Sequence, residues 1–357
     1  MKKQKKASDK LIFILMIVIG AFFGLFLAYY FDKHDGNLFV GFLAFLFLGA
    51  SVVLQIFFHE LGHLIGGLLS GYQFLSFRLF SICLVYDGKQ LKWVKMKVPG
   101  TLGQCLLIPT KDYRDFKYSA YLLGGIVANI IVSLISLLFI REWFIFVLIF
   151  MFVGFIFALS NGIPTEFNDG KTYQLARESK ANEYLLWLQL AANGDMTLGA
   201  IYNELPNSYF DDSKQVNNYL GDFQQFLILG RHYENEEWDL AKSLLEKMWN
   251  RKSEVMIIYQ WELKKELLYY LLMKEPNDVR IKSLLEDNSL KKYLKLEDIS
   301  NHRVLAVIAY VFEEDLVKAE ALIDEGIHWS KPVSNEGAKR VEIQLLREMS
   351  QVWYKQN

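Results

Sequence analysis

The residues best suited to chemistry lie in the run His59-Glu60-Leu61-Gly62-His63. Two histidines four positions apart share one face of an α-helix, so both imidazoles can reach a single Zn²⁺. Glu60 lies beside them and can accept the proton of a water that the metal acidifies. A chance occurrence is the alternative, but these side chains in an apolar helix without a metal would leave several polar groups unpaired. The run therefore predicts a catalytic metal site.

A catalytic zinc needs a third protein ligand and keeps a fourth position open for water. The candidate is Asp169, within residues 161–170 (NGIPTEFNDG), directly after an apolar stretch that would return to the depth of the histidines. Pro164 would interrupt the helix there, and Gly170 would permit a tight turn. Glu166 is the rival ligand, and an Asp-Gly pair at a helix end is by itself more often a turn.

Four apolar stretches must hold these residues, and we expect each to cross a membrane; they cover residues 11–31, 38–69, 118–140 and 143–165. About 20 apolar residues span the hydrocarbon core of a bilayer. A signal peptide is the alternative for the first stretch, but its apolar run is too long and lacks a cleavage site. The second stretch would measure about 48 Å as a helix. It carries the histidine motif near one end, and ionisable groups at membrane depth mark function.

Positive charges set the expected orientation in the membrane. Residues 1–10 contain five lysines, and residues 72–117 contain eight basic against three acidic side chains. Both segments should therefore be cytoplasmic. With four spans, both termini then lie in the cytosol, and we expect an integral protein of a bacterial cell membrane that contacts the lipid bilayer.

The net charge of −1 conceals two unlike halves, because residues 1–170 carry +5 and residues 171–357 carry −6. We expect three segments: a basic cytoplasmic N-terminus (1–10), a membrane core (11–170) and a cytoplasmic domain (171–357). A nearly neutral chain argues against nucleic acid as a partner, because phosphate binding needs a basic surface. The two cysteines are too few for a disulfide scaffold.

The membrane core resembles the site-2 protease family of intramembrane zinc metalloproteases. The resemblance covers about residues 38–172. Three features match in order and spacing: HELGH inside a span, a glycine-containing helix that reaches Asn129, and Asn161-x-x-Pro164 with Asp169-Gly170 eight positions after the Asn. The sequence departs from the family pattern twice, with Gly125 where Pro is usual and Asn168 where Leu is usual.

The resemblance implies that His59, His63 and Asp169 bind one catalytic Zn²⁺ and that Glu60 is the general base. It also implies that Asn129 and Asn161 face the active site and help to position the substrate. The alternative for Asn129 is a hydrogen bond between helices, which polar residues in membrane bundles commonly make.

Residues 74–98 predict a membrane-associated β-hairpin, with Asp87-Gly88 as its turn. A plain structural hairpin is one interpretation. The other is that its edge receives an unwound substrate as an added strand.

Residues 171–357 lack an uncharged span and show helical periodicity. Two stretches are similar, 231–247 and 310–325, with Ala241 and Ala319 equivalent at a separation of 78. This spacing resembles a degenerate tetratricopeptide-type array of antiparallel helix pairs, about two units of 39. Such arrays usually bind a partner protein on a concave surface. The alternative is a solubilising domain that stabilises a dimer.

The expected fold is therefore mainly α, a four-span membrane core with a small β-hairpin followed by a soluble helical array. The expected function is that of an intramembrane zinc endopeptidase that cleaves a transmembrane or membrane-bound peptide. The alternative is a catalytically silent membrane scaffold whose helical domain recruits partners. A transporter is disfavoured, because the ionisable groups in the spans form one ligand set and no repeated half exists.

Overall fold

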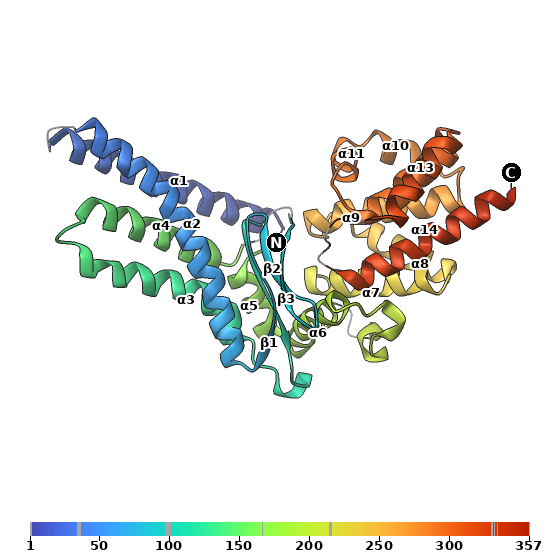
Figure 1. The fold of residues 1–357 in the computed structure, drawn as a ribbon, viewed down its shortest axis with the longest axis horizontal. Helices are drawn as coiled ribbons and strands as arrows, with labels where there is room; N and C mark the ends of the chain where they lie inside the picture. Colours follow the sequence, from blue (N-terminus) through green and yellow to red (C-terminus); the bar gives the residue numbers. More distant parts are fainter. Residues whose placement is uncertain are drawn as a thin grey trace. The chain divides into compact units, whose positions relative to one another are not determined.

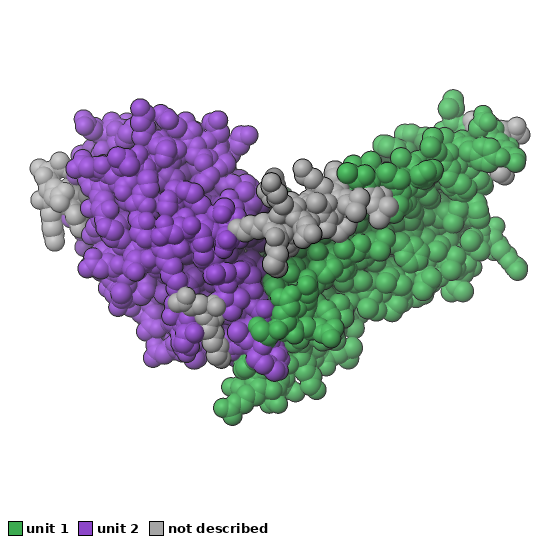
Figure 2. All heavy atoms as spheres, turned by 180° about the vertical axis from the view of Figure 1, so that it is seen from behind, with its two compact units in different colours: residues 1–86, 91–179 green, residues 87–90, 180–357 purple. Residues whose placement is uncertain are grey.

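The computed structural model describes residues 2–33, 37–96, 101–165, 167–213, 216–329, 331, 333 and 335–356. Within these residues the chain is mainly helical, with fourteen α-helices and one antiparallel sheet. It divides into two compact units, residues 1–86 with 91–179 and residues 87–90 with 180–357 (Figure 2). Each unit is described separately.

Four helices of the first unit are long and apolar enough to cross a bilayer. They are α1 (Lys2–Lys33), α2 (Leu38–Leu69), α3 (Ser119–Ser136, extended by the 3₁₀ turn η2, Leu137–Phe139) and α4 (Phe144–Gly162) (Figure 1). Their bounds agree with the predicted spans to within a few residues, except that α1 begins at Lys2. Large apolar side chains point outward from them, among them Phe45, which is 71% exposed. Such surfaces are typical of contact with lipid.

Helix α2 packs against α3 through small residues, and this packing sets the depth of the predicted site. Gly62 of α2 lies against the Gly124 carbonyl of α3, and Gly66 lies against the Ala120 carbonyl, so closely that a Cβ at either glycine would overlap the opposite backbone. Small residues at four-residue spacing allow such close approach of membrane helices. The crossing therefore brings the face of α3 that carries Gly125 and Asn129 against the histidine motif.

The predicted β-hairpin at 74–98 is wrong in extent, because the segment belongs to a four-stranded antiparallel sheet. The strands are β1 (Tyr72–Leu79), β2 (Ile82–Tyr86), β3 (Leu91–Lys95) and β4 (Gly103–Pro109), in the order β3-β2-β1-β4. The Asp87-Gly88 turn does connect two strands, as expected, and the Asp87 carboxylate accepts the backbone N–H groups of Lys89 and Gln90. Residues 97–100, at the end of the predicted hairpin, lie outside the described residues.

The first predicted strand is split by a tight turn at Phe80, whose φ is +51°. An aromatic residue rarely adopts this left-handed conformation, and no Gly or Pro marks the break in the sequence. The fourth strand was missed. It pairs with β1 from Tyr72↔Pro109 to Leu79↔Gly103, which makes β4 an edge of the sheet.

Helix α5 (Asp169–Glu178) belongs to the first unit and packs on α3 and α4. The first unit therefore extends through Ser179, nine residues beyond the predicted end of the membrane core at 170. Pro164 and Phe167, between α4 and α5, are exposed.

In the described part of the second unit, all regular elements are helices, and residues 87–90 of the strand connection are grouped with it. Its α-helices are α6 (Lys180–Thr197), α7 (Tyr219–Glu234), α8 (Trp238–Asn250), α9 (Ile257–Lys274), α10 (Arg280–Glu286), α11 (Asn288–Leu294), α12 (Ile299–Val307), α13 (Leu316–Ile327) and α14 (Glu336–Gln356). Shorter turns are η3 (Tyr202–Glu204), η4 (Asn207–Phe210) and the π-helical turn η5 (Ile308–Phe312). The central helix α9 packs against α8, α10, α11 and α12.

The two similar stretches form equivalent corners, one between α7 and α8 and one between η5 and α13. Glu236 and Glu314, also 78 positions apart, both adopt positive φ, +55° and +57°. Ala241 and Ala319 are both fully buried. The 78-residue separation does not divide into two units of 39, because α10 and α11, each seven residues long, occupy part of the interval.

Candidate metal centre

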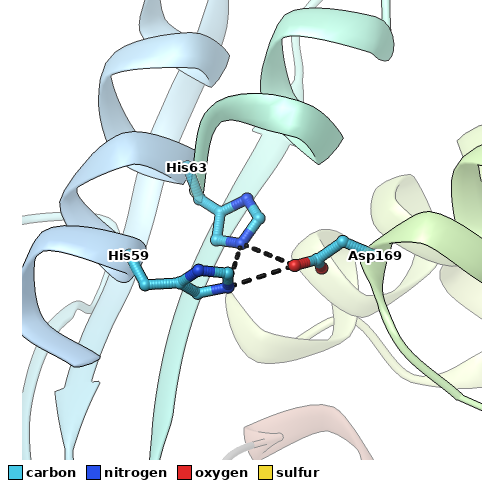
Figure 3. Close-up of side chains that lie close together, drawn as sticks. All are labelled: His59, His63 and Asp169. Atoms are coloured by element: carbon cyan, nitrogen blue, oxygen red, sulfur yellow. Dashed lines mark hydrogen bonds and ion pairs between the residues drawn. The ribbon is translucent and has the colours of Figure 1, made fainter. Parts of the chain in front are cut away.

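Three predicted ligands converge on one point (Figure 3). Oδ2 of Asp169 lies 3.1 Å from Nε2 of His59 and 3.3 Å from Nε2 of His63. The two Nε2 atoms are 3.1 Å apart. Zinc bonds of about 2.0–2.1 Å in tetrahedral geometry place neighbouring ligand atoms about 3.3–3.4 Å apart. The triangle therefore fits a tetrahedral Zn²⁺ with its fourth position open.

The opposite nitrogen of each imidazole fixes the tautomer of the ring. Nδ1 of His59 lies 2.8 Å from Oδ1 of Asn129, and Nδ1 of His63 lies 2.7 Å from the Tyr121 carbonyl oxygen. Both partners are acceptors, so each Nδ1 carries the proton and each neutral ring presents the lone pair of Nε2. Two nitrogen lone pairs and a carboxylate oxygen at this separation repel one another, and a cation between them removes the repulsion.

Asn129 is fully buried, and its amide group is committed within the protein. Its Nδ2 donates to the backbone carbonyl of Gln55 at 2.8 Å and to Oε1 of the same residue at 2.7 Å. These two acceptors leave Oδ1 directed at His59. The geometry supports the alternative of a hydrogen bond between helices, and the expected contact of Asn129 with the substrate stays a prediction. Asn129 acts on the centre by orienting His59.

The hydrogen-bonded chain continues from Gln55 to α3 and α4. The Nε2 of Gln55 donates to Oγ of Ser133 and to the Phe150 carbonyl, each at 3.3 Å. Gly154 of α4 leaves room for this group, because a Cβ there would overlap Oγ of Ser133. Sequence reasoning missed Gln55, although it precedes His59 by four residues on the same helix face and is polar within an apolar span.

Gly125 leaves space for both imidazoles. A Cβ at this position would lie 2.6 Å from Cε1 of His59 and 2.6 Å from Nε2 of His63. Both contacts are shorter than any ordinary van der Waals separation. Gly125, which replaces the proline usual in the family pattern, is thus a position where no side chain fits in this chain.

Asn168, the other departure, holds the third ligand in place. Its Oδ1 accepts the backbone N–H of Lys171 and caps α5, while its Nδ2 donates to the Ser160 and Ile163 carbonyls at 2.7 Å each. Asparagine is a preferred N-cap residue. Gly170 packs on the Gly162 carbonyl, where a Cβ would overlap. Together these contacts fix the start of α5 against the end of α4, and so fix Asp169.

The Asp169 carboxylate is held in its ionised form. Burial favours the neutral acid. Where protons rather than a metal lie between these groups, hydrogen bonds and charge from the protonated His59 and His63 outweigh burial, so the pKa of Asp169 is lowered. An ionised carboxylate is the form that binds a metal.

Glu60 is 8% exposed and lies beside the ligands on α2, next to the start of β4. A Cβ at Gly103 would lie 2.8 Å from Cγ of Glu60. The nearest basic charge acting on it from the sheet is Arg78, which is itself buried and donates to the Phe80 carbonyl at 2.6 Å. The predicted base is thus confined between the histidine helix and one sheet edge.

Two other predicted site residues lie apart from the ligand triangle or outside the described part. Nδ2 of Asn161 donates to the Phe157 carbonyl one turn earlier in α4. Its role in substrate positioning therefore stays a prediction. Glu166, the rival ligand, lies outside the described residues.

Comparisons of the chain with models of protein families, with curated proteins and with solved structures find no match. The geometry of the site and the sequence motifs are therefore the features that indicate a function.

Proposed function

We propose that this protein is an intramembrane zinc endopeptidase of the site-2 protease type. The observation that carries the proposal is the triangle of His59, His63 and Asp169, whose ligand atoms lie 3.1–3.3 Å apart with both imidazole tautomers fixed from behind. Two imidazoles and one carboxylate with an open position are a donor set typical of catalytic zinc. The histidines lie in a helix apolar enough to cross a bilayer, which favours a substrate in or at the membrane.

Zinc, when bound, supplies a Lewis acid that lowers the pKa of a water and polarises a carbonyl. The residues of the chain then do the proton chemistry. The Glu60 carboxylate accepts the proton of the attacking water and delivers it to the nitrogen of the leaving amine. Its burial against Gly103 keeps the Glu60 side chain out of solvent, one residue from the predicted ligand His59.

The substrate we propose is a transmembrane or membrane-bound peptide cleaved near the cytoplasmic side. The distribution of lysines supports this orientation, with both termini in the cytosol. The peptide must be extended before its amide can reach the centre. The alternative is a catalytically silent scaffold. Such a protein would not need Glu60 beside a complete set of predicted ligands, so the presence of Glu60 favours the peptidase.

The test compares wild type, Glu60→Gln and the matched control Glu142→Gln, which changes an exposed acid in the loop between α3 and α4. All three should purify with one equivalent of zinc, measured by mass spectrometry of the metal. Cells with Glu60→Gln should accumulate an uncleaved membrane peptide that is absent from wild type and from the control. Equal peptide profiles in wild type and Glu60→Gln, or iron instead of zinc in wild type, would overturn the proposal.

A further inference from the structure

The second unit contains a cavity of about 960 Å³ that the proposed peptidase reaction does not use. It lies among α9 to α13 and is lined mainly by apolar side chains, including Leu285, Leu294 and Leu305. Leu296 and Phe312 also line it and are 39% and 57% exposed. Sites for small ligands typically occupy about 300–1,000 Å³, and they are mostly apolar with a few placed polar groups. The cavity meets the size criterion at its upper end.

Two residues of the lining carry buried polar atoms that have no hydrogen-bond partner among the described residues. The first is Oδ1 of Asn301, a residue that is 1% exposed. The Nδ2 of Asn301 donates to the Tyr293 and Leu296 carbonyls at 3.1 and 3.0 Å. These bonds fix the orientation of the amide, so the unpaired atom is an acceptor.

The second unpaired atom is Nε1 of Trp329, which can only donate. The indole stands edge-on to the ring of His302, with 5.0 Å between ring centroids. Burying a donor and an acceptor without partners is costly. Both atoms are closed to water in this conformation, so a ligand that pairs with them must displace the side chains that cover them.

The wide turn η5 brings further apolar surface to the same cavity. Ile308 and Phe312, at its two ends, both line the cavity. The equivalent corner after α7 has the same positive-φ glutamate and is built without a π-helical turn. The chain can therefore form this type of corner, with a positive-φ glutamate, without a π-helical turn before it. Such turns are frequently found at functional sites.

We propose that this cavity binds a short peptide with large apolar side chains. The main chain of the peptide supplies an N–H for Oδ1 of Asn301 and a carbonyl for Nε1 of Trp329. The leucines and Phe312 receive the side chains. A fatty acid could place its carboxylate near Lys291 and Lys295, which also line the cavity, but it would offer no N–H to Asn301. Peptide binding here does not depend on the zinc centre.

The experiment uses the full chain in lipid nanodiscs and a pool of blocked hexapeptides, acetyl-X-Ser-X-Ser-X-Lys-amide, where X is Leu, Ile or Phe. Peptides retained on immobilised discs are identified by mass spectrometry, and empty discs correct for partition into lipid. Trp329→Phe removes the donor and keeps an aromatic ring. Trp249→Phe, on α8 and absent from the cavity lining, is the matched control. Circular dichroism verifies that both variants fold.

Wild type and Trp249→Phe should retain the same peptides, and Trp329→Phe should bind them about three- to tenfold more weakly, as expected for one lost hydrogen bond. Phe312→Ala, at an exposed position, should also weaken binding. N-methylation of the backbone amide that donates to Asn301 should weaken binding to wild type, because it removes the N–H and keeps the carbonyl. Three results would overturn the proposal: no retention above empty discs, equal affinity of wild type and Trp329→Phe, or selective binding of laurate instead of peptides.

Discussion

Adding a single methyl group at Gly125 should disable the metal centre. Gly125 lies on α3 opposite the histidine motif of α2, and the Cβ of Gly125→Ala would lie 2.6 Å from His63 Nε2 and 2.6 Å from His59 Cε1. Alanine is a better helix former than glycine, so the substitution should not weaken α3 itself. Its effect falls on the two imidazoles.

The size of the effect follows from the contact distance. Ordinary contacts of a Cβ begin at 3.4 Å, so each ring must retreat by about 0.8 Å. Metal–ligand distances tolerate deviations of about 0.2 Å. Neither ring can retreat freely, because the hydrogen bonds of both Nδ1 atoms, to Asn129 and to the Tyr121 carbonyl, hold them. We therefore expect zinc affinity to fall at least about 100-fold, or about 2.8 kcal/mol.

Zinc affinity is measured by competition with a chromophoric chelator, on protein in nanodiscs. Gly49→Ala and Gly162→Ala are matched controls. A Cβ at Gly49 meets nothing within 4 Å, and a Cβ at Gly162 meets only Ile126, at 3.8 Å. Both controls should bind zinc as wild type does.

Wild-type zinc affinity in a folded Gly125→Ala protein would refute this account of the centre. It would mean that α2 and α3 separate easily, and that the ligand triangle does not depend on their close crossing. Loss of zinc in the Gly49→Ala control would instead show that replacing a helical glycine by alanine weakens zinc binding without any steric overlap.

Three further predictions use the same protein. Gln55→Leu should lower zinc affinity about 10- to 100-fold in the chelator assay, because it removes the groups that orient Asn129 toward a ligand. Burial raises the pKa of the Cys83 and Cys105 thiols, so little thiolate forms at neutral pH. Iodoacetamide should therefore modify both thiols only after the protein unfolds. Rapid labelling of the folded protein would contradict this prediction. Arg303→Met removes one of two basic partners of the buried Glu266 carboxylate, while Lys265 stays paired with it. The substitution should lower the free energy of unfolding of the second unit by about 3 kcal/mol in urea titrations.

The convergence of the three candidate ligands could be predicted because their signals are local or short in sequence. His59 and His63 meet on one helix face by the geometry of the helix alone. Asp169 was suggested by its position after an apolar stretch and by a motif spacing, and the structure brings it to the histidines. Long uncharged stretches likewise predicted the four apolar helices with nearly correct bounds.

What the sequence did not reveal depends on contacts between distant segments. The hydrogen-bond partner of Asn129 is Gln55, 74 positions away. A polar residue in an apolar helix does not by itself indicate which side chain it contacts. Strand β4 carries no turn signal that distinguishes it from a loop, and it is a strand because it pairs with β1. Phe80 takes a backbone conformation that its residue type disfavours.

The metal centre and the helix packing of the first unit depend on one another. The two histidines lie on α2, and Asn129, which orients His59, lies on α3. The third predicted ligand, Asp169, lies on α5, and hydrogen bonds of Asn168 hold the start of α5 at the end of α4. Glycines at positions 62, 125, 154 and 170 lie where these elements touch, and a side chain at any of them would overlap its neighbour. The triangle can therefore form only when α2, α3 and α4 are assembled. A zinc ion held by this triangle would bind the assembled state alone, so its affinity would include the free energy of that assembly. A substitution that loosens the crossing should then weaken zinc binding even when it contacts no predicted ligand.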